Sequence, residues 1–525
     1  MHWPLPLHIG SDIPKDLGDP LIQAWQIAWD GNALQHQLSD FWQANIFYPL
    51  ENSLAFSDAL VGYAPFGLIG EGFQAAIVRY DLLFMFAYAL AFIGGYLLAR
   101  ELGVDRFPAA VAGVAFAYAP WRLEQDGHMH VISSGGIPLA LFLLVRGYRR
   151  GSVRTILAGW LVAAWQLALG FTLGLMLAYL LAILAVFVLL AWRRKRPSGD
   201  VIAASLIGAT AFAAIALVLA LPYQEVRDDH PESARTKYVV DAFSGGPEMF
   251  LAASDLSTVW GSITEPVRDG LDNVPEQTLF PGLLVVLLAG VGLSRASPFP
   301  KRLRIGLGLG VLAVALLSLG FQVPANGVPY PYRALYELPG WDSVRTPGRL
   351  NTLTSLGLAL LAAGGAHALI ARERPWIRRM RWPHGRTVLA VALPLIVLVE
   401  GMGFPAPHPT VAKPPAGLRQ ATPPRLHLPM NAYESRRFIL WTTNDFPEIV
   451  NGRGSFDPTF FVELEEEMAA FPNPAVVEHL RELGINTVVL HPELVAGTPW
   501  ENWQDWPLEG ESVGGMVFYR LNTAG

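Results

Sequence analysis

Long runs of apolar residues separated by short charged loops dominate the first 400 positions of the 525-residue chain. A bilayer core of about 30 Å needs about 20 apolar residues per helix, and fewer where a helix is short or partly buried in a bundle. The expected fold is therefore an α-helical polytopic membrane protein. We predict ten membrane-spanning helices, over residues 79–99, 106–121, 132–147, 154–170, 172–192, 202–222, 279–293, 303–320, 347–371 and 387–400.

The overall composition supports this class of protein. Only 16% of the residues are charged and the mean hydropathy is +0.34, whereas a soluble globular protein carries roughly 25% charged residues. The net charge of −6 and the lack of a basic stripe argue against a nucleic-acid partner. The absence of cysteine excludes disulfides and thiolate chemistry. Arginine outnumbers lysine 33 to 5, which indicates a GC-rich genome and a bacterial source.

The charged residues predict which side of the membrane each loop occupies. The loops 100–106, 146–154, 193–200, 294–304 and 372–386 contain 20 Lys and Arg but only 4 Asp and Glu, and the remaining chain contains 18 and 40. Cationic loops stay in the cytoplasm. We therefore expect a multi-pass protein of the bacterial cytoplasmic membrane, whose long loops and C-terminus are extracytoplasmic.

Three long segments lie on the predicted outer side. Residues 1–78 form the first outer loop, residues 223–278 interrupt the bundle of residues 79–400, and residues 401–525 follow it. Nothing in the sequence would carry the first loop across the membrane, because no charged n-region precedes an apolar h-region. An eleventh helix is therefore expected to be missing upstream.

The last 125 residues divide into a Pro-rich linker, 401–424, and a small extracytoplasmic α/β domain, 425–525. The linker should be extended rather than helical. The domain pattern predicts helices over 458–471 and 474–483 and strands over 486–491 and 516–521.

The first outer loop contains an aspartate directly before an apolar helical pattern. Ile22, Trp25, Ala28 and Trp29 follow helical spacing and predict an amphipathic helix at the membrane interface, where Trp is favoured. Asp19, followed by a proline, has two interpretations. It is typical of a helix N-cap, or it is a carboxylate that accepts a proton or binds a metal.

A second acidic cluster follows the second predicted span. Glu124, Asp126, His128 and His130 alternate along the chain, and in an extended segment they would point the same way. Such a face suits Zn²⁺ or Mn²⁺, with Asp126, His128 and His130 as candidate ligands. The alternative is a solvated loop whose charges end the helices. A divalent metal is thus the one cofactor that the pattern leaves open.

Two arginines stand at the outer boundary of the span 347–371. Arg345 and Arg349 could clamp a phosphate bidentately, and Glu276 and His128 are further candidates for substrate or phosphate binding. Alternatively, the arginines extend to the headgroups or pair with outer acids. Glu276 could equally end a helix.

These segments together resemble a known superfamily. The relevant motifs are Gly18-Asp19-Pro20, Phe47-Tyr48-Pro49, Ser57-Asp58, the loop from His128 to Pro138, Phe280-Pro281-Gly282, Arg345-Thr346-Pro347-Gly348-Arg349 and Asn451-Gly452-Arg453-Gly454. The arrangement resembles the GT-C superfamily of integral-membrane glycosyltransferases, and is similar to bacterial YfhO-like and protein-mannosyltransferase-like proteins.

The resemblance implies transfer of a sugar from a polyprenyl-phosphate carrier to an envelope glycan, lipid or protein on the outer face. It implies that Asp19 is the base or metal-binding acid, and that Glu124 and Asp126 are catalytic acids of the second loop. The sequence leaves two other functions open. A transporter or lipid-handling protein would use the same outer cavity without chemistry, and an assembly factor would bind an envelope partner through residues 425–525.

Overall fold

The structure of the chain is a computed structural model that describes residues 2–322, 330–371 and 385–522. It divides the chain into two compact units. Unit 1 consists of Met1–Trp3, Phe84–Val218 and Arg235–Ala406, and unit 2 of Pro4–Leu83, Leu219–Ala234 and Pro407–Gly525. The first outer loop and the C-terminal residues, which are far apart in sequence, thus belong to one unit. Most of the predicted inner loop 372–386 lies outside the described residues.

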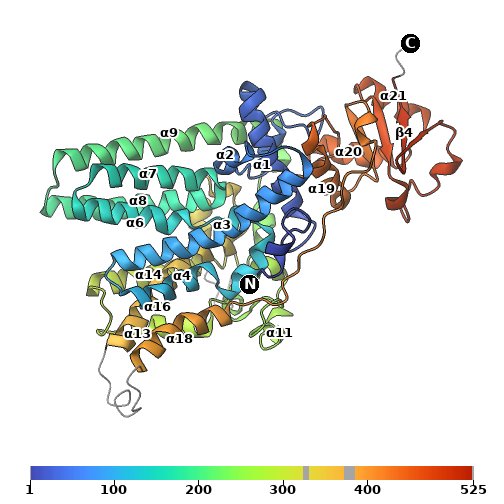
Figure 1. The fold of residues 1–525 in the computed structure, drawn as a ribbon. Coiled ribbons are helices and arrows are strands. Elements are labelled where there is room, and N and C mark those ends of the chain that lie inside the picture. Colours follow the sequence, from blue (N-terminus) through green and yellow to red (C-terminus); the bar gives the residue numbers. More distant parts are fainter. Residues whose placement is uncertain (1, 323–329, 372–384, 523–525) are drawn as a thin grey trace. The chain divides into compact units, whose positions relative to one another are not determined.

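Unit 1 consists of long and short helices, and the longer ones overlap the predicted spans (Figure 1). The helices are α3 (Gly72–Glu101, which begins in unit 2), α4 (Arg106–Ala117), α5 (Met129–Ile132), α6 (Gly136–Arg150), α7 (Val153–Ala168), α8 (Phe171–Arg194), α9 (Gly199–Asp229, which ends in unit 2), α10 (Lys237–Asp241), α11 (Glu265–Arg268), α12 (Val274–Gln277), α13 (Leu283–Gly292), α14 (Lys301–Leu317), α15 (Tyr332–Tyr336), α16 (Asn351–Ala371) and α18 (Gly385–Glu400). Each of the ten predicted spans overlaps one of these helices.

The helices pack in two groups within unit 1. Helices α6, α7 and α8 follow one another in sequence and lie side by side, while α16 contacts α4, α13 and α14 (Figure 1). Glycines allow the closest approach. A Cβ atom on Gly292 of α13 would lie 1.9 Å from the carbonyl oxygen of Leu361 on α16. Small residues let helix backbones approach in this way, which is a common device in membrane bundles.

The apolar helices mark the chain as a multi-pass membrane protein. Among the described residues, five segments are long and apolar enough to cross a membrane, namely 72–101, 129–150, 171–194, 199–229 and 347–371. Four shorter apolar helices accompany them. Large apolar side chains remain exposed on α8, α9 and α14, among them Phe187, Leu217 and Leu309. Such surfaces suit a lipid solvent. The number of crossings and the orientation stay predictions.

Unit 2 is organised around α1 (Asp19–His36), which contacts the short α2 (Ala64–Gly67) and α19 (Ala432–Trp441). The predicted helix begins where expected, but its polar face is not exposed to water. Residues on both faces are buried, including Trp25 and Trp29 on one and Gln23 and Gln26 on the other. Tertiary contacts therefore cover the face that the sequence pattern assigns to water.

The end of unit 2 contains a four-stranded sheet of order β1-β2-β4-β3. Strand β1 (Arg425–Leu428) pairs in parallel with β2 (Thr487–Leu490), and β4 (Met516–Arg520) pairs antiparallel with both β2 and β3 (Glu511–Val513). The predicted helices and strands are confirmed by α20 (Thr459–Met468), α21 (Pro474–Glu482), β2 and β4. Strand β1 was not predicted, although its sequence Arg-Leu-His-Leu alternates polar and apolar residues, and the structure buries all four positions.

Candidate functional site

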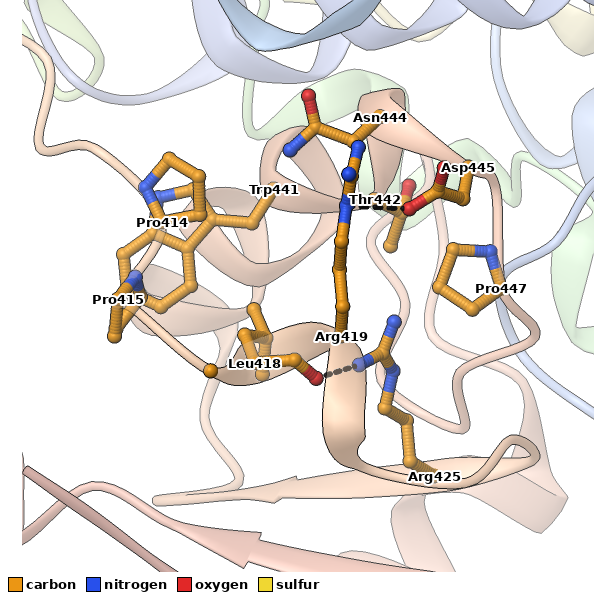
Figure 2. A pocket seen from close by; sticks show the side chains of 11 residues that line it. Pro414, Pro415, Leu418, Arg419, Arg425, Trp441, Thr442, Asn444, Asp445 and Pro447 are labelled. Atoms are coloured by element: carbon orange, nitrogen blue, oxygen red, sulfur yellow. Dashed lines mark hydrogen bonds and ion pairs between the residues drawn. The ribbon is translucent and has the colours of Figure 1, made fainter. Parts of the chain in front are cut away.

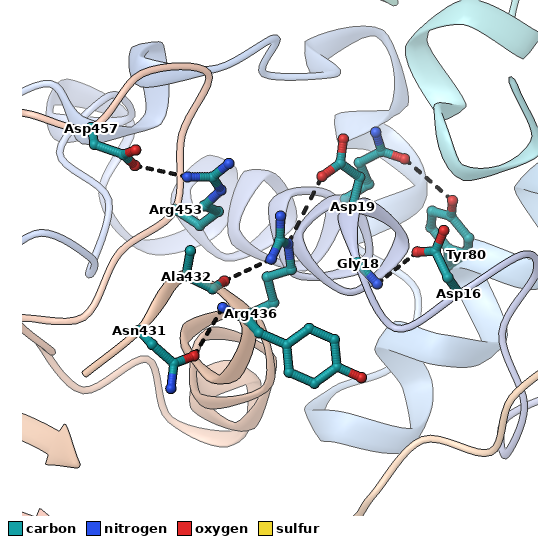
Figure 3. Close-up of polar contacts among 11 residues, drawn as sticks. Asp16, Gly18, Asp19, Tyr80, Asn431, Ala432, Arg436, Arg453 and Asp457 are labelled. Carbon is teal, nitrogen blue, oxygen red and sulfur yellow. Dashed lines mark hydrogen bonds and ion pairs between the residues drawn. The ribbon is translucent and has the colours of Figure 1, made fainter. Parts of the chain in front are cut away.

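Asp19 is the first residue of α1, so it does not occupy the N-cap position. Gly18 occupies the N-cap position without a side-chain bond, and Asp16 instead accepts a hydrogen bond from the Gly18 N–H at 2.7 Å. The N-cap interpretation of Asp19 is therefore wrong. Its carboxylate is 42% exposed and lies 4.0 Å from Nε of Arg436 on α19 (Figure 3). A partly exposed carboxylate at a helix start can take a proton from another molecule.

Asp19 opens a polar stripe along one face of α1. Asp19, Gln23, Gln26 and Asp30 are spaced by four, three and four residues, which places them on one helix face. Gln23 accepts a hydrogen bond from the Tyr80 hydroxyl at 3.2 Å, and Gln26 donates one to the Asp58 carbonyl oxygen at 3.0 Å. Exposure falls to zero at Asp30. The stripe thus runs from a solvent-accessible acid to a buried one.

Asp30 is a carboxylic acid buried in the interior of unit 2. Neither of its carboxylate oxygens has a hydrogen-bond partner among the described residues. Burial raises the pKa of Asp30 well above its usual value. A neutral carboxylic acid can therefore persist here at a pH above the ordinary value of an aspartate side chain.

The second outer loop is helical rather than extended. Pro120–Gly127 forms a 3₁₀ helix and Met129–Ile132 forms the short α5. Successive residues of a 3₁₀ helix are about 120° apart, so residues two apart in sequence point in different directions. Glu124 and Asp126 therefore point in different directions. The extended segment on which one shared face of Glu124, Asp126, His128 and His130 depended is absent, so that prediction is wrong.

The two acids of this loop have separate buried partners in unit 1. Glu124 is 7% exposed and accepts a hydrogen bond from the Ser254 hydroxyl. Asp126 is 4% exposed and accepts one from the Tyr88 hydroxyl. Arg122 secures the loop by donating to the Ser134 hydroxyl at 3.0 Å and to the Ile132 carbonyl at 2.7 Å. Glu124 and Asp126 thus lie in different local environments.

Glu276, Arg349 and His130 form a buried charged cluster in unit 1. Arg349 donates Nη2 to Oε1 of Glu276 at 2.5 Å and Nε to Oε2 at 3.3 Å. Its Nη1 lies 2.9 Å from Nε2 of His130. Because a guanidinium can only donate, Nε2 of His130 is the acceptor and its proton resides on Nδ1. The edge of Arg349 that would grip a phosphate bidentately is occupied by Glu276.

Residues around this cluster also act on Glu276. Burial alone would raise the pKa of Glu276, but the charges of Arg349, His128 and Arg345 and the Arg349 hydrogen bond outweigh it, and the pKa is lowered. Glu276 is therefore ionised at neutral pH. Arg345 is only partly buried and holds its guanidinium 5.5 Å from the centre of the Phe243 ring. Within unit 1, Arg345 is thus the more accessible of the two arginines.

The candidate metal ligands do not gather into one group. In the ranges 2–322, 330–371 and 385–522 the structure contains no cluster of three or more His, Asp or Glu side chains able to hold a metal ion. Asp126 bonds Tyr88, and His130 bonds Arg349. The geometry of the described residues therefore supports no ligand set from Asp126, His128 and His130.

Sequence reasoning missed the partners of these acids. Arg436 lies more than 400 positions after Asp19, and Ser254 lies 130 positions after Glu124. No local pattern marks such pairs. Asp30 could have been found, because the spacing of Asp19, Gln23, Gln26 and Asp30 on one helical face is visible in the sequence.

The fold is similar to that of solved membrane glycosyltransferases. No family model and no curated protein matches the sequence. The arabinofuranosyltransferase AftD from mycobacteria matches over 99% of this chain, at 16% identity and a TM-score of 0.61. The chain has the GT-C fold. The chain spans only 39% of the length of AftD, and at 16% identity the likeness concerns the fold alone.

Two further glycosyltransferases match less closely. The archaeal oligosaccharyltransferase AglB from Archaeoglobus fulgidus matches over 92% of this chain and 66% of its own, at 13% identity and a TM-score of 0.40. ArnT from Cupriavidus metallidurans matches over 98% of this chain and 95% of its own, at 13% identity and a TM-score of 0.38.

Proposed function

We propose that the chain is a membrane glycosyltransferase that moves a sugar from a polyprenyl-phosphate carrier to an envelope acceptor on the extracytoplasmic face. The observation that carries the proposal is the GT-C fold, which AftD shares over 99% of this chain. The apolar helices agree with a donor that stays in the bilayer. A lipid-linked donor needs no soluble nucleotide-binding domain, and the sequence contains no P-loop and no Gly-rich dinucleotide turn.

Asp19 is the base of the proposed reaction. Its carboxylate is partly exposed at the start of α1, whereas Glu124, Asp126 and Glu276 are buried and hydrogen-bonded. An acceptor hydroxyl would lose its proton to Asp19 as its oxygen bonds to the anomeric carbon of the sugar. The bond from that carbon to the carrier phosphate breaks, and its electron pair leaves with the polyprenyl phosphate. General base catalysis contributes about 10²–10⁴-fold.

Arg345 is the proposed cation for the leaving phosphate. The two donors on the fork of Arg349 already bond Glu276, and its remaining Nη bonds His130. Arg349 is therefore better suited to position His130 and Glu276 than to grip a phosphate. The partly buried Arg345 would stabilise the negative charge that develops as the phosphate leaves.

An Asp19→Asn variant tests the base. We expect transfer from a radiolabelled polyprenyl-phosphate sugar in proteoliposomes to fall by about 10²–10⁴-fold, with an unchanged thermal unfolding midpoint. The matched control is Asp40→Asn, which removes an exposed carboxylate of the same unit beyond the end of α1. Equal transfer by the two variants would reject Asp19 as the base.

An Arg345→Gln variant tests the cation. Loss of one preorganised group that stabilises developing negative charge costs roughly 10²–10³-fold in rate, so we expect a loss of that size in the same assay. Arg333→Gln is the control, because Arg333 lies in the same unit and also stacks on an aromatic ring, 5.9 Å from the centre of Phe321. A loss confined to Arg349→Gln would contradict the assignment.

A further inference from the structure

A small pocket in unit 2 has no role in the proposed transfer. It encloses about 160 Å³ between the Pro-rich linker, the end of α19 and the start of β1 (Figure 2). One water molecule occupies roughly 30 Å³ in the liquid, so the space exceeds what a few waters need. It is smaller than the roughly 300–1,000 Å³ of sites for drug-sized ligands. The volume suits one small cyclic molecule.

One wall of the pocket is apolar and rigid. It consists of the rings of Pro414 and Pro415 beside the indole of Trp441, as Figure 2 shows. The indole is fixed, because its Nε1 donates a hydrogen bond to the Ala412 carbonyl oxygen at 2.8 Å. The flat indole and the apolar proline rings offer a surface for the C–H face of another ring.

The opposite wall is charged. Arg419 and Asp445 are exposed and form an ion pair of 2.7 Å, while Arg425 is only 5% exposed (Figure 2). Arg425 donates one Nη to the Leu418 carbonyl oxygen at 2.7 Å, but its Nε has no partner among the described residues. Burial lowers the pKa of Arg425 to about 10, against the opposite effect of Asp445. The side chain therefore remains a cation at neutral pH.

A buried cation with an unsatisfied donor is costly unless an acceptor binds to it. Arginine recognises carboxylates and phosphates through parallel N–H donors. Two arginines against one aspartate also leave the charged wall with an excess positive charge. The ligand should therefore have an anionic group at one side and an apolar ring face at the other.

We propose that this pocket binds one anionic sugar residue, whose carboxylate or phosphate meets Arg425 and whose ring lies against Trp441, Pro414 and Pro415. The proposal is independent of the transfer reaction, because it concerns binding alone. A uronic acid and a sugar phosphate share the required chemistry, and an experiment with both separates them.

Saturation-transfer NMR on the purified full chain in detergent tests the proposal. The probes are glucuronate, glucose 6-phosphate, neutral glucose, and the ring-free anions acetate and phosphate. We expect one or both anionic sugars to bind at least about 10-fold more tightly than glucose, acetate or phosphate, since a hydrogen bond to a charged group is worth roughly that factor or more. Binding of glucose or of the ring-free anions as tight as that of the anionic sugars would overturn it.

Two substitutions locate the binding. Arg425→Gln should weaken it by about 10-fold or more. Because Arg425 also donates a hydrogen bond to the Leu418 carbonyl oxygen, the thermal unfolding midpoint of this variant is measured alongside its affinity. Arg419→Gln, at an exposed position, should weaken binding by about 2–5-fold. Its matched control is Arg520→Gln, which breaks an exposed 2.9 Å pair with Glu511 on the far strands of the sheet and should change nothing. Equal affinities of the Arg419 and Arg520 variants would overturn the assignment.

Discussion

The pKa values of two buried carboxylates in this protein are shifted in opposite directions. Glu276 in unit 1 is 7% exposed and Asp30 in unit 2 is fully buried. The pKa of Glu276 is lowered although its burial alone would raise it, and the pKa of Asp30 is raised by burial. The two shifts differ in direction because a cation lies beside Glu276. Arg349 bonds both oxygens of Glu276, whereas no described residue donates a hydrogen bond to Asp30.

The contrast shows that burial alone does not decide whether an acid is charged. Burial disfavours the charged carboxylate at both positions, and only at Glu276 do nearby cations offset this cost. Asp19 has a third kind of environment, because its carboxylate is partly exposed and lies 4.0 Å from Arg436. A buried, paired acid suits a structural role, and a partly exposed acid suits chemistry.

Removal of Arg349 should have the largest effect on this contrast. Arg349→Met leaves Glu276 buried without its main cation, and breaking such a buried pair costs roughly 3–5 kcal/mol. In the native protein, the contribution of Glu276 is present above its ordinary value of 4.5 and is lost as pH falls through the lower folded pKa. In the variant, stability should instead fall as pH rises. Chemical denaturation at several pH values measures both effects.

Arg333→Met is the control for Arg349→Met, because Arg333 is an exposed arginine of the same unit. A loss of stability by the Arg349 variant no greater than that of the control would show that the ion pair contributes little. The difference between Glu276 and Asp30 would then need another cause.

Asp30→Asn should have an intermediate effect of the opposite sign. The folded pKa of Asp30 is raised, so its favourable contribution is complete below its ordinary value of 3.8 and is lost as pH rises through the folded pKa. The variant should therefore be more stable than the native protein at pH 8, with little difference near pH 4. Each 1 kcal/mol gained raises the unfolding midpoint by roughly 2–4 °C. A difference that does not depend on pH would contradict a raised pKa.

Arg436→Gln should have the smallest effect. Pairs with an exposed partner are worth about 0.2–1 kcal/mol, and the variant should lower sugar transfer by about 2–5-fold. Unfolding midpoints should be almost unchanged. If transfer fell as far as in Asp19→Asn, Arg436 would contact the substrate itself rather than only orient Asp19.

Local composition was sufficient to predict much of the fold. The ten apolar runs coincide with helices, and α20, α21, β2 and β4 appear where the C-terminal pattern places them. These elements are set by the period and length of apolar segments. The pattern failed at α1 and at the second outer loop. There, contacts with distant segments buried polar residues, and a 3₁₀ helix replaced the expected extended chain.

By itself, the sequence determined that this is a helical membrane protein with acids crowded into its longer loops, because these properties depend on neighbours along the chain. Only the tertiary structure decided the state of each acid. Glu276 meets an arginine 73 positions away, Asp19 meets one on α19, and Asp30 meets none among the described residues. The charge of a buried group is set by atoms within a few ångströms, and the fold brings those atoms together from distant positions.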